Sequence, residues 1–351
     1  MLLILAASSL SAEIKVNEQV LEQLVNLIES DGATQSLIIS NNEKIIHEFY
    51  GTNYDEDDLA TSWSIAKTFY AALIGVAIQK DLIAYDDLDK PINHFIPQLK
   101  SDPIGEITLY NILAMKTGLE ITEYLNEEMF FSLNNLDFAM NVEPKAEQGN
   151  VYEYNNVNTM LLNPIISNIF GDSPHEVLVS EIFIPLEIEE YGLWKDSAGN
   201  DMTYYGIDLK PKDFLKFAHL IMNRGKLENI QIIDERFITN SIKPLSSGTG
   251  EWFGLHWSIR KYDENKTLVG LEVTDGQTMF FIPEERLAMV RFTKYFHNSE
   301  KGHQVKFGPL EYLLWMPYSW IKYITTLVAS ETEPDKEPED DPSINFPDTK
   351  S

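Results

Sequence analysis

The sequence predicts an α/β sandwich, in which one antiparallel sheet is flanked by helices and carries an inserted, mostly helical region. Three observations predict this fold class. Strand-like runs occur near both ends of the chain, helix and loop patterns fill the middle, and one helical stretch is apolar on every side. A helix without a polar face belongs inside a protein, so we expect it between the sheet and the inserted helices.

The N-terminal part of the chain predicts a helix and a β-hairpin. Apolar residues recur at helical spacing over 14–28. Two β-rich runs follow at 36–39 and 44–50, on either side of a turn-forming Asn-Asn pair. We therefore expect the chain to enter the sheet through this hairpin.

The rest of the chain alternates between helical and strand-like stretches. The apolar helix covers 65–78, and the mixed helix and loop pattern from about 81 to 200 is the predicted insert. A helix is predicted over 212–224, with Gly225 as its C-terminal cap. Three strands and a last helix complete the order, at 253–260, 278–282, 287–293 and 309–315.

Both ends of the chain differ in composition from the single domain expected over 13–329. Residues 1–12 are apolar and then small, like a signal peptide without its basic start. They predict a periplasmic or secreted protein, with a buried N-terminal segment as the alternative. The segment 315–329 is aromatic and apolar but interrupted and too short to span a bilayer, so it predicts peripheral membrane contact at most. Residues 330–351 contain eight acids and four prolines and predict a disordered acidic tail.

Composition excludes several functions. The 351 residues include 27 basic and 55 acidic side chains, a net charge of −28, and so acidic a surface argues against nucleic acid as a partner. The chain has no cysteine, which excludes disulfides, a thiolate nucleophile and a Cys-ligated zinc site. The seven histidines show no metal-ligand spacing and are predicted to be structural or exposed. They are His47, His94, His175, His219, His256, His297 and His303.

The strongest candidate site is Ser64-Ile65-Ala66-Lys67, at the start of the apolar helix. Residues three apart share a helix face, so the Lys67 amine is expected beside the Ser64 hydroxyl. The helix N-terminus stabilises developing negative charge, and burial lowers the pKa of a lysine toward that of a usable base. The alternative is a chance pattern, because a chain of this length contains roughly one Ser-x-x-Lys match at average composition.

A second candidate site is Tyr154-Asn155-Asn156. A phenol close to a lysine can relay its proton to a leaving group, and an asparagine amide can orient both groups. The alternative is a loop tyrosine beside turn-forming asparagines. Four further aromatic residues either line a substrate cleft or pack in the core: Tyr204, Tyr205, Trp252 and Trp257.

Together these segments resemble the serine hydrolase family that contains class C β-lactamases, D-alanyl-D-alanine carboxypeptidases, and esterases and amidases related to nylon-oligomer hydrolases. That family carries Ser-x-x-Lys, Tyr-x-Asn and a Gly-containing triplet in this order. The matching positions here are Ser64/Lys67, Tyr154/Asn156 and Thr274-Asp275-Gly276. The similarity extends from about residue 30 to 315 and includes ITLYNILAMKTGL at 107–119 and DGQTMFFIPEERLAMVRFT at 275–293.

The resemblance implies a β-lactamase/transpeptidase-like fold and acyl transfer to water, with no metal or organic cofactor. Ser64 is then the nucleophile, and Lys67 and Tyr154 move its proton. The family builds its oxyanion hole from two backbone N–H groups, which correspond here to Ser64 and Gln277. The substrate is a small ester or amide, and the residues expected to contact it are Asn156, Tyr205, Asp275, Gly276 and Gln277.

Asp275 departs from the family pattern, because the triplet is usually Lys-Thr-Gly or a His-containing version. A carboxylate at this place repels the carboxylate of a β-lactam or of a D-Ala-D-Ala peptide, so we predict an ester or amide hydrolase. Two alternatives stay open: a true β-lactamase or D-Ala-D-Ala peptidase, and a non-catalytic member that binds a ligand. The Asp275 side chain either faces the cleft or pairs with a cation such as Arg260 or Arg291.

Overall fold

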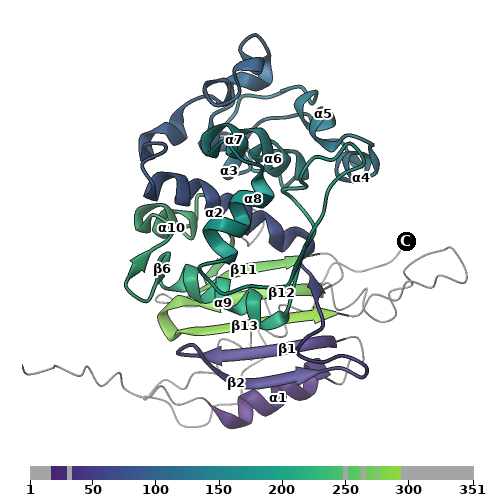
Figure 1. Cartoon of the computed structure of the whole chain (residues 1–351), viewed down its shortest axis with the longest axis vertical. Coiled ribbons are helices and arrows are strands. Elements are labelled where there is room, and N and C mark those ends of the chain that lie inside the picture. The colour runs from purple at the N-terminus through teal and green to yellow at the C-terminus, as the bar shows by residue number, and fades with distance from the viewer. Residues whose placement is uncertain (1–16, 30–33, 248–251, 262–265, 274–275, 294–351) are drawn as a thin grey trace, which may run out of the picture.

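The computed structural model describes five stretches of the chain, and Figure 1 shows their arrangement. They are residues 17–29, 34–247, 252–261, 266–273 and 276–293. The predicted signal peptide, C-terminal helix, membrane-contact segment and acidic tail lie outside these residues, at 1–12, 309–315, 315–329 and 330–351. Within the described stretches, no helix has the length and apolar character needed to cross a membrane.

One antiparallel sheet joins the two ends of the described chain. β1 (Thr34–Asn41) pairs with β13 (Leu287–Thr293), so the N-terminal hairpin becomes part of the C-terminal sheet. The strand order is β2-β1-β13-β12-β11-β10-β9-β8. The remaining strands are β2 (Lys44–Tyr50), β8 (Ser246–Ser247), β9 (Trp252–Phe253), β10 (Ser258–Lys261), β11 (Thr267–Val273) and β12 (Gln277–Ile282).

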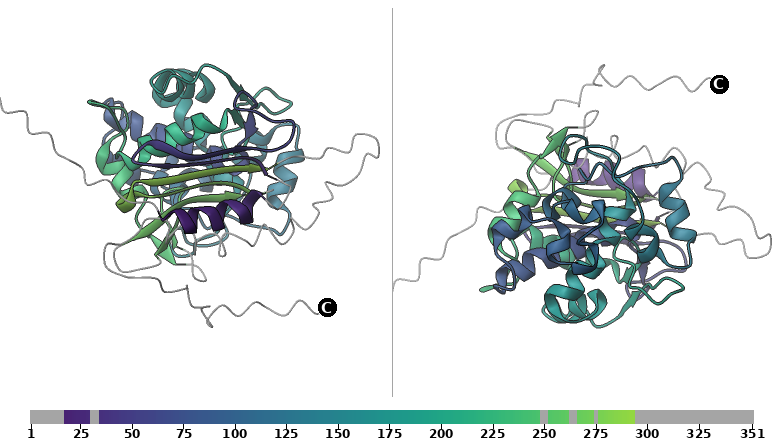
Figure 2. Two further views of the ribbon diagram at one scale, coloured as in Figure 1. Left: turned by 90° about the horizontal axis from the view of Figure 1, so that it is seen from below. Right: turned by 90° about the horizontal axis from the view of Figure 1, so that it is seen from above.

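Helices cover both faces of this sheet (Figure 2). α1 (Glu18–Glu29) lies on one face, where its Leu24 packs with Leu37 of β1. Ile38, the next residue of β1, faces the opposite core, because successive side chains of a strand point to opposite faces. The antiparallel sheet between helical layers confirms the predicted α/β sandwich.

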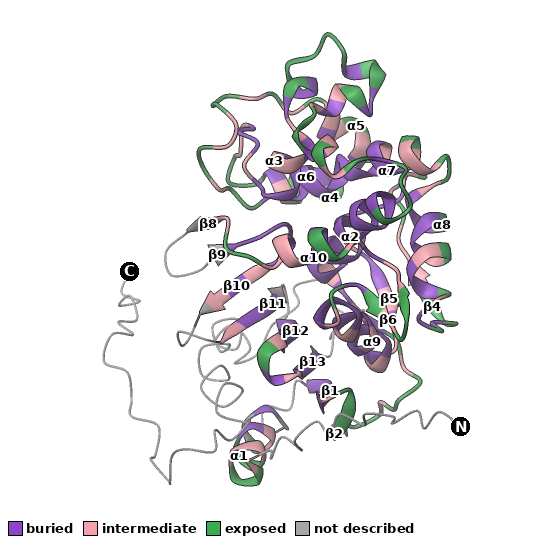
Figure 3. Ribbon diagram, turned by 90° about the vertical axis from the view of Figure 1, so that its left-hand side faces the viewer, coloured by how far each residue is buried: buried purple, intermediate pink, exposed green. Residues whose placement is uncertain are grey.

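α2 (Ala66–Gln79) is the central helix of the molecule. Every side chain from Ala66 to Ile78 is buried (Figure 3), which confirms the interior position predicted from its lack of a polar face. A Cβ atom on Gly75 would lie 2.5 Å from side-chain atoms of Ile233 and Phe237. Glycine at this position therefore lets α10 (Glu235–Ser241) pack closely against α2.

Most of the short helices and turns in the stretch 81–200 lie on the side of α2 that faces away from the sheet (Figure 1). They are η2 (Tyr85–Asp89), η3 (Ile92–His94), η4 (Pro97–Leu99), η5 (Pro103–Glu106), α3 (Leu109–Leu113), α4 (Leu125–Phe131), α5 (Asn135–Met140), α6 (Asn156–Met160), α7 (Leu162–Phe170), α8 (Pro174–Leu178) and the π-helix η6 (Val179–Phe183). A small sheet, β3-β5-β4, takes its strands from before this stretch, from its end and from just after it. Its strands are β3 (Ala60–Thr61), β4 (Tyr191–Leu193) and β5 (Ile207–Leu209).

The structure corrects the predicted strands in two places. The prediction of a single strand at 253–260 is wrong, because this segment forms the hairpin β9–β10. His256, with a φ of 63°, lies in the turn between the two strands. β11 is a strand that the pattern does not predict, because Gly270 interrupts it. A Cβ atom on Gly270 would lie 2.1 Å from the carbonyl oxygen of Met279, so the close approach of β12 requires glycine there.

The helix predicted at 212–224 is α9 (Pro211–Met222), which packs on β12 and β13. Its C-cap is Asn223, so the prediction that Gly225 is the cap is wrong by two residues. Gly225 nevertheless closes this end of the helix: it has a φ of 77°, and its N–H donates to the Leu220 carbonyl (2.8 Å). The hairpin β6 (Lys226–Leu227) and β7 (Ile230–Gln231) follows.

His219 of α9 makes the stability of the fold depend on pH. Its Nε2 lies 2.8 Å from Oγ of Ser40, and burial lowers its pKa from 6.5 to about 4. The unfolded chain therefore takes up this proton at a higher pH than the folded chain, so the free energy of unfolding falls as the pH drops from 6.5 toward 4. One proton of difference corresponds to about 1.4 kcal/mol per pH unit.

We expect His219→Gln to reduce the loss of stability between pH 7 and pH 5, measured by urea unfolding at both pH values. The exposed His94 supplies the matched control, and His94→Gln is expected to keep the wild-type slope. An unchanged slope in His219→Gln would mean that this histidine does not titrate differently in the two states.

Candidate active site

Ser64 lies in a short 3₁₀ turn, η1 (Trp63–Ile65), directly before α2. The turn is anchored to β5, because Ser62 N–H donates to the Ile207 carbonyl (2.8 Å) and Ile207 N–H donates to Ser62 Oγ (3.0 Å). Trp63 has a φ of 42°, a left-handed conformation that is rare for a bulky residue and is retained where surrounding contacts enforce it. The nucleophile candidate is thus held at the entrance of the central helix by a strained, anchored turn.

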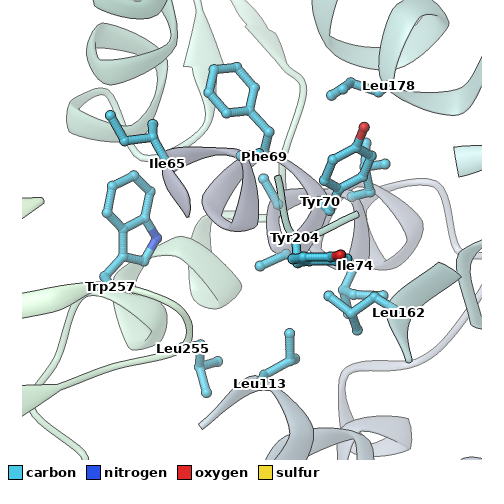
Figure 4. Packing of buried hydrophobic residues seen from close by; sticks show 14 of the residues in the cluster. Ile65, Phe69, Tyr70, Ile74, Leu113, Leu162, Leu178, Tyr204, Leu255 and Trp257 are labelled. Carbon is cyan, nitrogen blue, oxygen red and sulfur yellow. The ribbon is translucent and has the colours of Figure 1, made fainter. Parts of the chain in front are cut away.

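Lys67 lies one turn further along, with its side chain inside the protein. Its Nζ is 2.9 Å from Ser64 Oγ and 3.0 Å from the Tyr204 carbonyl oxygen. Only 1% of the residue is exposed, and the helix that carries it packs among buried hydrophobic side chains such as Ile74 and Leu113 (Figure 4). This burial holds the pKa of Lys67 well below its usual value.

Tyr154 lies two residues before α6, and its side chain reaches Ser64 and Lys67. Its hydroxyl is hydrogen-bonded to Ser64, and its ring centroid is 5.3 Å from Lys67 Nζ. Although 38% of the residue is exposed, desolvation around the hydroxyl raises its pKa above the usual value, while the bond to Ser64 acts in the opposite direction. Tyr154 therefore remains a neutral phenol at neutral pH.

The two pKa shifts separate the acid from the base. The environment disfavours the charged ammonium of Lys67 and also disfavours the charged phenolate of Tyr154. A neutral amine can accept the Ser64 proton, and a neutral phenol can donate one. Opposite shifts on neighbouring groups are the pattern expected of an acid and a base that work together.

Asn156 is the first residue of α6, which is capped by Asn155 through its side-chain oxygen (2.9 Å to Asn158 N). Its backbone N–H donates to Asn126 Oδ1 of α4 (2.7 Å). Within the described part of the protein, neither the oxygen nor the nitrogen of the Asn156 amide has a partner, although the residue is 1% exposed. A buried amide without partners is costly unless a ligand or solvent supplies them, so it is suited to contact a substrate.

Tyr205 joins Lys67 to a group of aromatic rings. Its centroid is 4.8 Å from Lys67 Nζ, and it meets the rings of Trp63 and Phe130 edge-on, at 5.4 Å and 5.6 Å. Phe130 contacts Phe131 at 5.1 Å, and Phe131 is 79% exposed. We call Trp63, Phe130, Phe131 and Tyr205 the aromatic cluster. It leads from the lysine amine to the protein surface.

Gln277 is the first residue of β12 and Gly276 directly precedes it, and β12 lies against the η1 turn that carries Ser64. Gly276 has a φ of 74°, and the Gln277 amide is bonded in both directions to Thr293, at 2.8 Å and 3.0 Å. The peptide between these two residues is therefore fixed close to the nucleophile turn. Asp275 and Thr274 lie outside the described residues.

The remaining aromatic and histidine candidates from the sequence are mostly buried residues with a structural role. Tyr204 and Trp257 are buried in the core, whereas Tyr205 lies at the site, and the side chain of Trp252 is outside the described residues. His256 donates from Nδ1 to the Leu113 carbonyl (2.7 Å), and its Nε2 accepts from Thr159 (2.8 Å). Burial lowers the pKa of His256 to about 3, so this histidine is neutral and structural. Among the described residues, no group of acidic and histidine side chains could hold a metal ion.

Three contributors to the site carry no signal in the sequence. The Tyr204 carbonyl, which accepts from Lys67, is a backbone group that any residue would supply. Asn126 belongs to a different helix from the Asn156 that it holds. The left-handed φ of Trp63 contradicts the preference of its residue type.

Many solved structures have a similar fold, and three of them show the extent of the similarity. A candidate 6-aminohexanoate-dimer hydrolase from Bacillus anthracis has a TM-score of 0.68 and 20% identity, over 85% of this chain and 81% of that one. A candidate beta-lactamase from Bacteroides dorei has a TM-score of 0.69 and 16% identity, over 90% and 100%. A D-alanine carboxypeptidase from Burkholderia cenocepacia has a TM-score of 0.60 and 15% identity, over 79% and 94%. These likenesses show a shared fold.

Among curated proteins, none matches the sequence. The family model described as Beta-lactamase matches residues 25–307, which is most of the chain and includes Ser64, Lys67 and Tyr154. This match confirms the resemblance drawn from the motifs: the chain belongs to the Beta-lactamase family.

Proposed function

We propose that this protein is a serine hydrolase that cleaves an ester or amide bond through an acyl-enzyme on Ser64. The observation that carries the proposal is the 2.9 Å contact between Lys67 Nζ and Ser64 Oγ, in a setting that lowers the pKa of the lysine. Membership of the Beta-lactamase family supports it. A lysine that is neutral before the reaction can remove the serine proton as the hydroxyl attacks.

The proposed reaction has two halves. Ser64 Oγ attacks the carbonyl carbon, its proton moves to Lys67, and the carbonyl oxygen becomes an oxyanion stabilised by the N–H groups of Ser64 and Gln277. As the intermediate collapses, Tyr154 gives its proton to the leaving alcohol or amine and regains one from Lys67. Water then attacks the acyl-enzyme and gives a proton to Lys67. As this second intermediate collapses, Lys67 returns the proton to Ser64 Oγ, which releases the acid and restores both residues.

The aromatic cluster indicates the substrate class, which we propose to be a neutral ester or amide with an aromatic or large apolar group. Aromatic side chains bind apolar groups through their large contact area and through ring stacking. The acidic surface of the protein, with a net charge of −28, disfavours anionic substrates at a distance. Asn156 then bonds the polar part of the substrate.

Replacing Phe131 with alanine is expected to lower kcat/KM for a phenylacetyl ester about fivefold and to leave an acetyl ester of the same alcohol unchanged. An aromatic contact contributes about 0.5–1.5 kcal/mol, which sets this magnitude. Because Phe131 is 79% exposed, its truncation removes little packing. Ile184→Ala, at another exposed apolar residue (66%), is the control and should affect neither ester. Equal losses on both esters with Phe131→Ala would remove the aromatic cluster from substrate binding.

The test of the function itself is covalent capture. A fluorophosphonate should label the protein at Ser64, located by peptide mass spectrometry, and a panel of neutral esters and amides should give Ser64-dependent turnover. Efficient hydrolysis of a chromogenic cephalosporin or a D-Ala-D-Ala peptide would instead support a β-lactamase or a cell-wall peptidase. Absence of both labelling and turnover would support a non-catalytic, ligand-binding member.

We further propose that the protein is exported to the periplasm or secreted, on the basis of the apolar residues 1–12, and that 315–329 contacts a membrane surface peripherally. Cell fractionation followed by N-terminal sequencing tests the first proposal, because a cleaved signal peptide leaves a new N-terminus. Co-sedimentation of the full chain with lipid vesicles tests the second.

A further inference from the structure

The residue whose carbonyl accepts from Lys67 is held in place through its own side chain. The Tyr204 hydroxyl lies 2.8 Å from Oδ1 of Asn135, the first residue of α5. Both residues are buried, so water does not compete for this hydrogen bond. Burial also raises the pKa of Tyr204, so the phenol keeps its proton and can donate it to Asn135.

The amide of Asn135 also holds the end of α4. Its Nδ2 donates to the carbonyl oxygens of Met129 (2.6 Å) and Ser132 (3.1 Å). Carbonyl oxygens only accept hydrogen bonds, so the amide nitrogen must face them and the amide oxygen must face Tyr204. Met129 and Ser132 directly flank the two phenylalanines of the aromatic cluster. Asn135 therefore fixes the backbone on both sides of that pair.

The backbone of Asn135 is anchored to the loop that carries Tyr204. Its N–H donates to Asp196 Oδ2 (2.8 Å), and Asp196 Oδ1 accepts from the Asn200 N–H (2.8 Å) within the same loop. Asn135 thus bonds to the loop at two points, Asp196 and Tyr204. It joins this loop to α4, the helix that carries the two phenylalanines.

The Tyr204 carbonyl acts more strongly on the transition state than on the resting enzyme. A neutral amine has two N–H groups and one lone pair. An N–H of Lys67 directed at this carbonyl (3.0 Å) leaves the lone pair for the proton of Ser64 (2.9 Å). Once Lys67 has taken that proton it is an ammonium, and a charged donor makes a stronger hydrogen bond to the same carbonyl. Displacing the carbonyl should therefore slow the reaction more than it weakens substrate binding.

We propose that Asn135 is a positioning residue that connects the aromatic cluster to the catalytic base. Through the Tyr204 hydroxyl it fixes the acceptor that orients Lys67, and through the end of α4 it fixes the two phenylalanines that bind the substrate. This inference rests on the proposed function. An asparagine with a purely structural role would affect stability alone.

The experiment measures kcat and KM for a phenylacetyl ester and an acetyl ester of the same alcohol. Tyr204→Phe keeps the ring and the carbonyl but removes the bond to Asn135. It is expected to lower kcat about fivefold for both esters, the contribution of one hydrogen bond, with KM changed less than twofold. Because Lys67 accepts a proton in both halves of the reaction, this loss appears whichever half limits the rate.

Asn135→Ala breaks both connections. It is expected to show the same loss of kcat for both esters and, in addition, an about fivefold higher KM for the phenylacetyl ester alone, the contribution of one aromatic contact. This split between kcat and KM separates positioning from a general loss of stability, which would not distinguish the two esters.

Tyr85→Phe is the matched control, because the Tyr85 hydroxyl of η2 is likewise bonded to an asparagine, Asn240 of α10 (2.6 Å). It should lower the melting temperature and leave kcat and KM unchanged for both esters. If Tyr204→Phe does not fold, the double variant Tyr204→Phe/Asn135→Leu decides, since it leaves no unpaired amide oxygen in the core.

Wild-type kcat in Tyr204→Phe, or in the double variant, overturns the connection to Lys67. Unchanged KM for the phenylacetyl ester in Asn135→Ala overturns the connection to the aromatic cluster. In either case a Ser64 acyl-enzyme that still forms leaves the proposed function intact. A wild-type protein without Ser64-dependent acylation overturns both proposals.

Discussion

Ser64→Ala is expected to lower kcat for an activated neutral ester by about four to six orders of magnitude, the size of loss seen when a catalytic serine is removed. The variant has no hydroxyl to form the acyl-enzyme, so the burst of released alcohol should disappear together with fluorophosphonate labelling. Steady-state kinetics and intact-protein mass spectrometry measure both. Substrate binding should persist, because Asn156 and the aromatic cluster are untouched.

The fold should survive this change. Ser64 is 4% exposed, and its turn is fixed by the hydrogen bond between Ser62 and Ile207. Alanine has a higher helix propensity than serine, so the substitution should not disturb the start of the helix. Ser62→Ala is therefore a useful contrast: it removes the hydroxyl that binds Ile207 N–H and should cost stability while activity falls only moderately. Near-wild-type turnover in Ser64→Ala would show that another residue is the nucleophile.

Lys67→Arg is expected to slow acylation by about 10²–10⁴-fold, the usual contribution of a general base. A guanidinium stays protonated at neutral pH, so it preserves the positive charge but cannot accept the Ser64 proton. Stopped-flow measurement of the burst phase isolates the acylation step. A burst as fast as that of the wild type would remove Lys67 from the mechanism.

The absence of cysteine allows a sharper control for Lys67. A Lys67→Cys variant contains a single thiol, which can be alkylated in denaturant with bromoethylamine to give a thia-lysine of nearly the same length, and then refolded. Recovery of most of the acylation rate would show that a neutral amine at this place is what the reaction needs. The wild-type protein, carried through the same treatment, reports any loss from refolding.

The sequence predicts those parts of the site that depend on spacing within one element. Ser64 and Lys67 lie three residues apart at the start of one helix, so their contact follows from helical geometry. Tyr154 reaches them only through the tertiary fold, and its position could be predicted from the family resemblance alone. β11 could not be predicted because it contains Gly270, a residue type that is rare in strands. The close approach of β12 requires this glycine, and that contact is not visible in the sequence.

Contacts made by backbone groups and by residues distant in the chain could not be predicted. The Tyr204 carbonyl is independent of side-chain identity, and the bond from Arg291 to the Gly276 carbonyl depends on how the strands pair. A single arginine in the apolar run Leu287–Thr293 interrupts the pattern of a buried strand, which is itself a sign of a special role. Its partners become visible only when the strands are paired.

The pairing of β1 with β13 affects how the protein is made. Arg291 and Thr34, which touch in the sheet, are 257 residues apart in the chain. At translation rates of about 5–20 residues per second, β1 waits on the order of 10–50 s for β13 to leave the ribosome. During that time the apolar nucleophile helix has no completed sheet to pack on, and the Gln277 peptide does not yet exist. A chain that lacks β13 is therefore both prone to aggregate and unable to react, so hydrolytic activity begins only after β13 has been made.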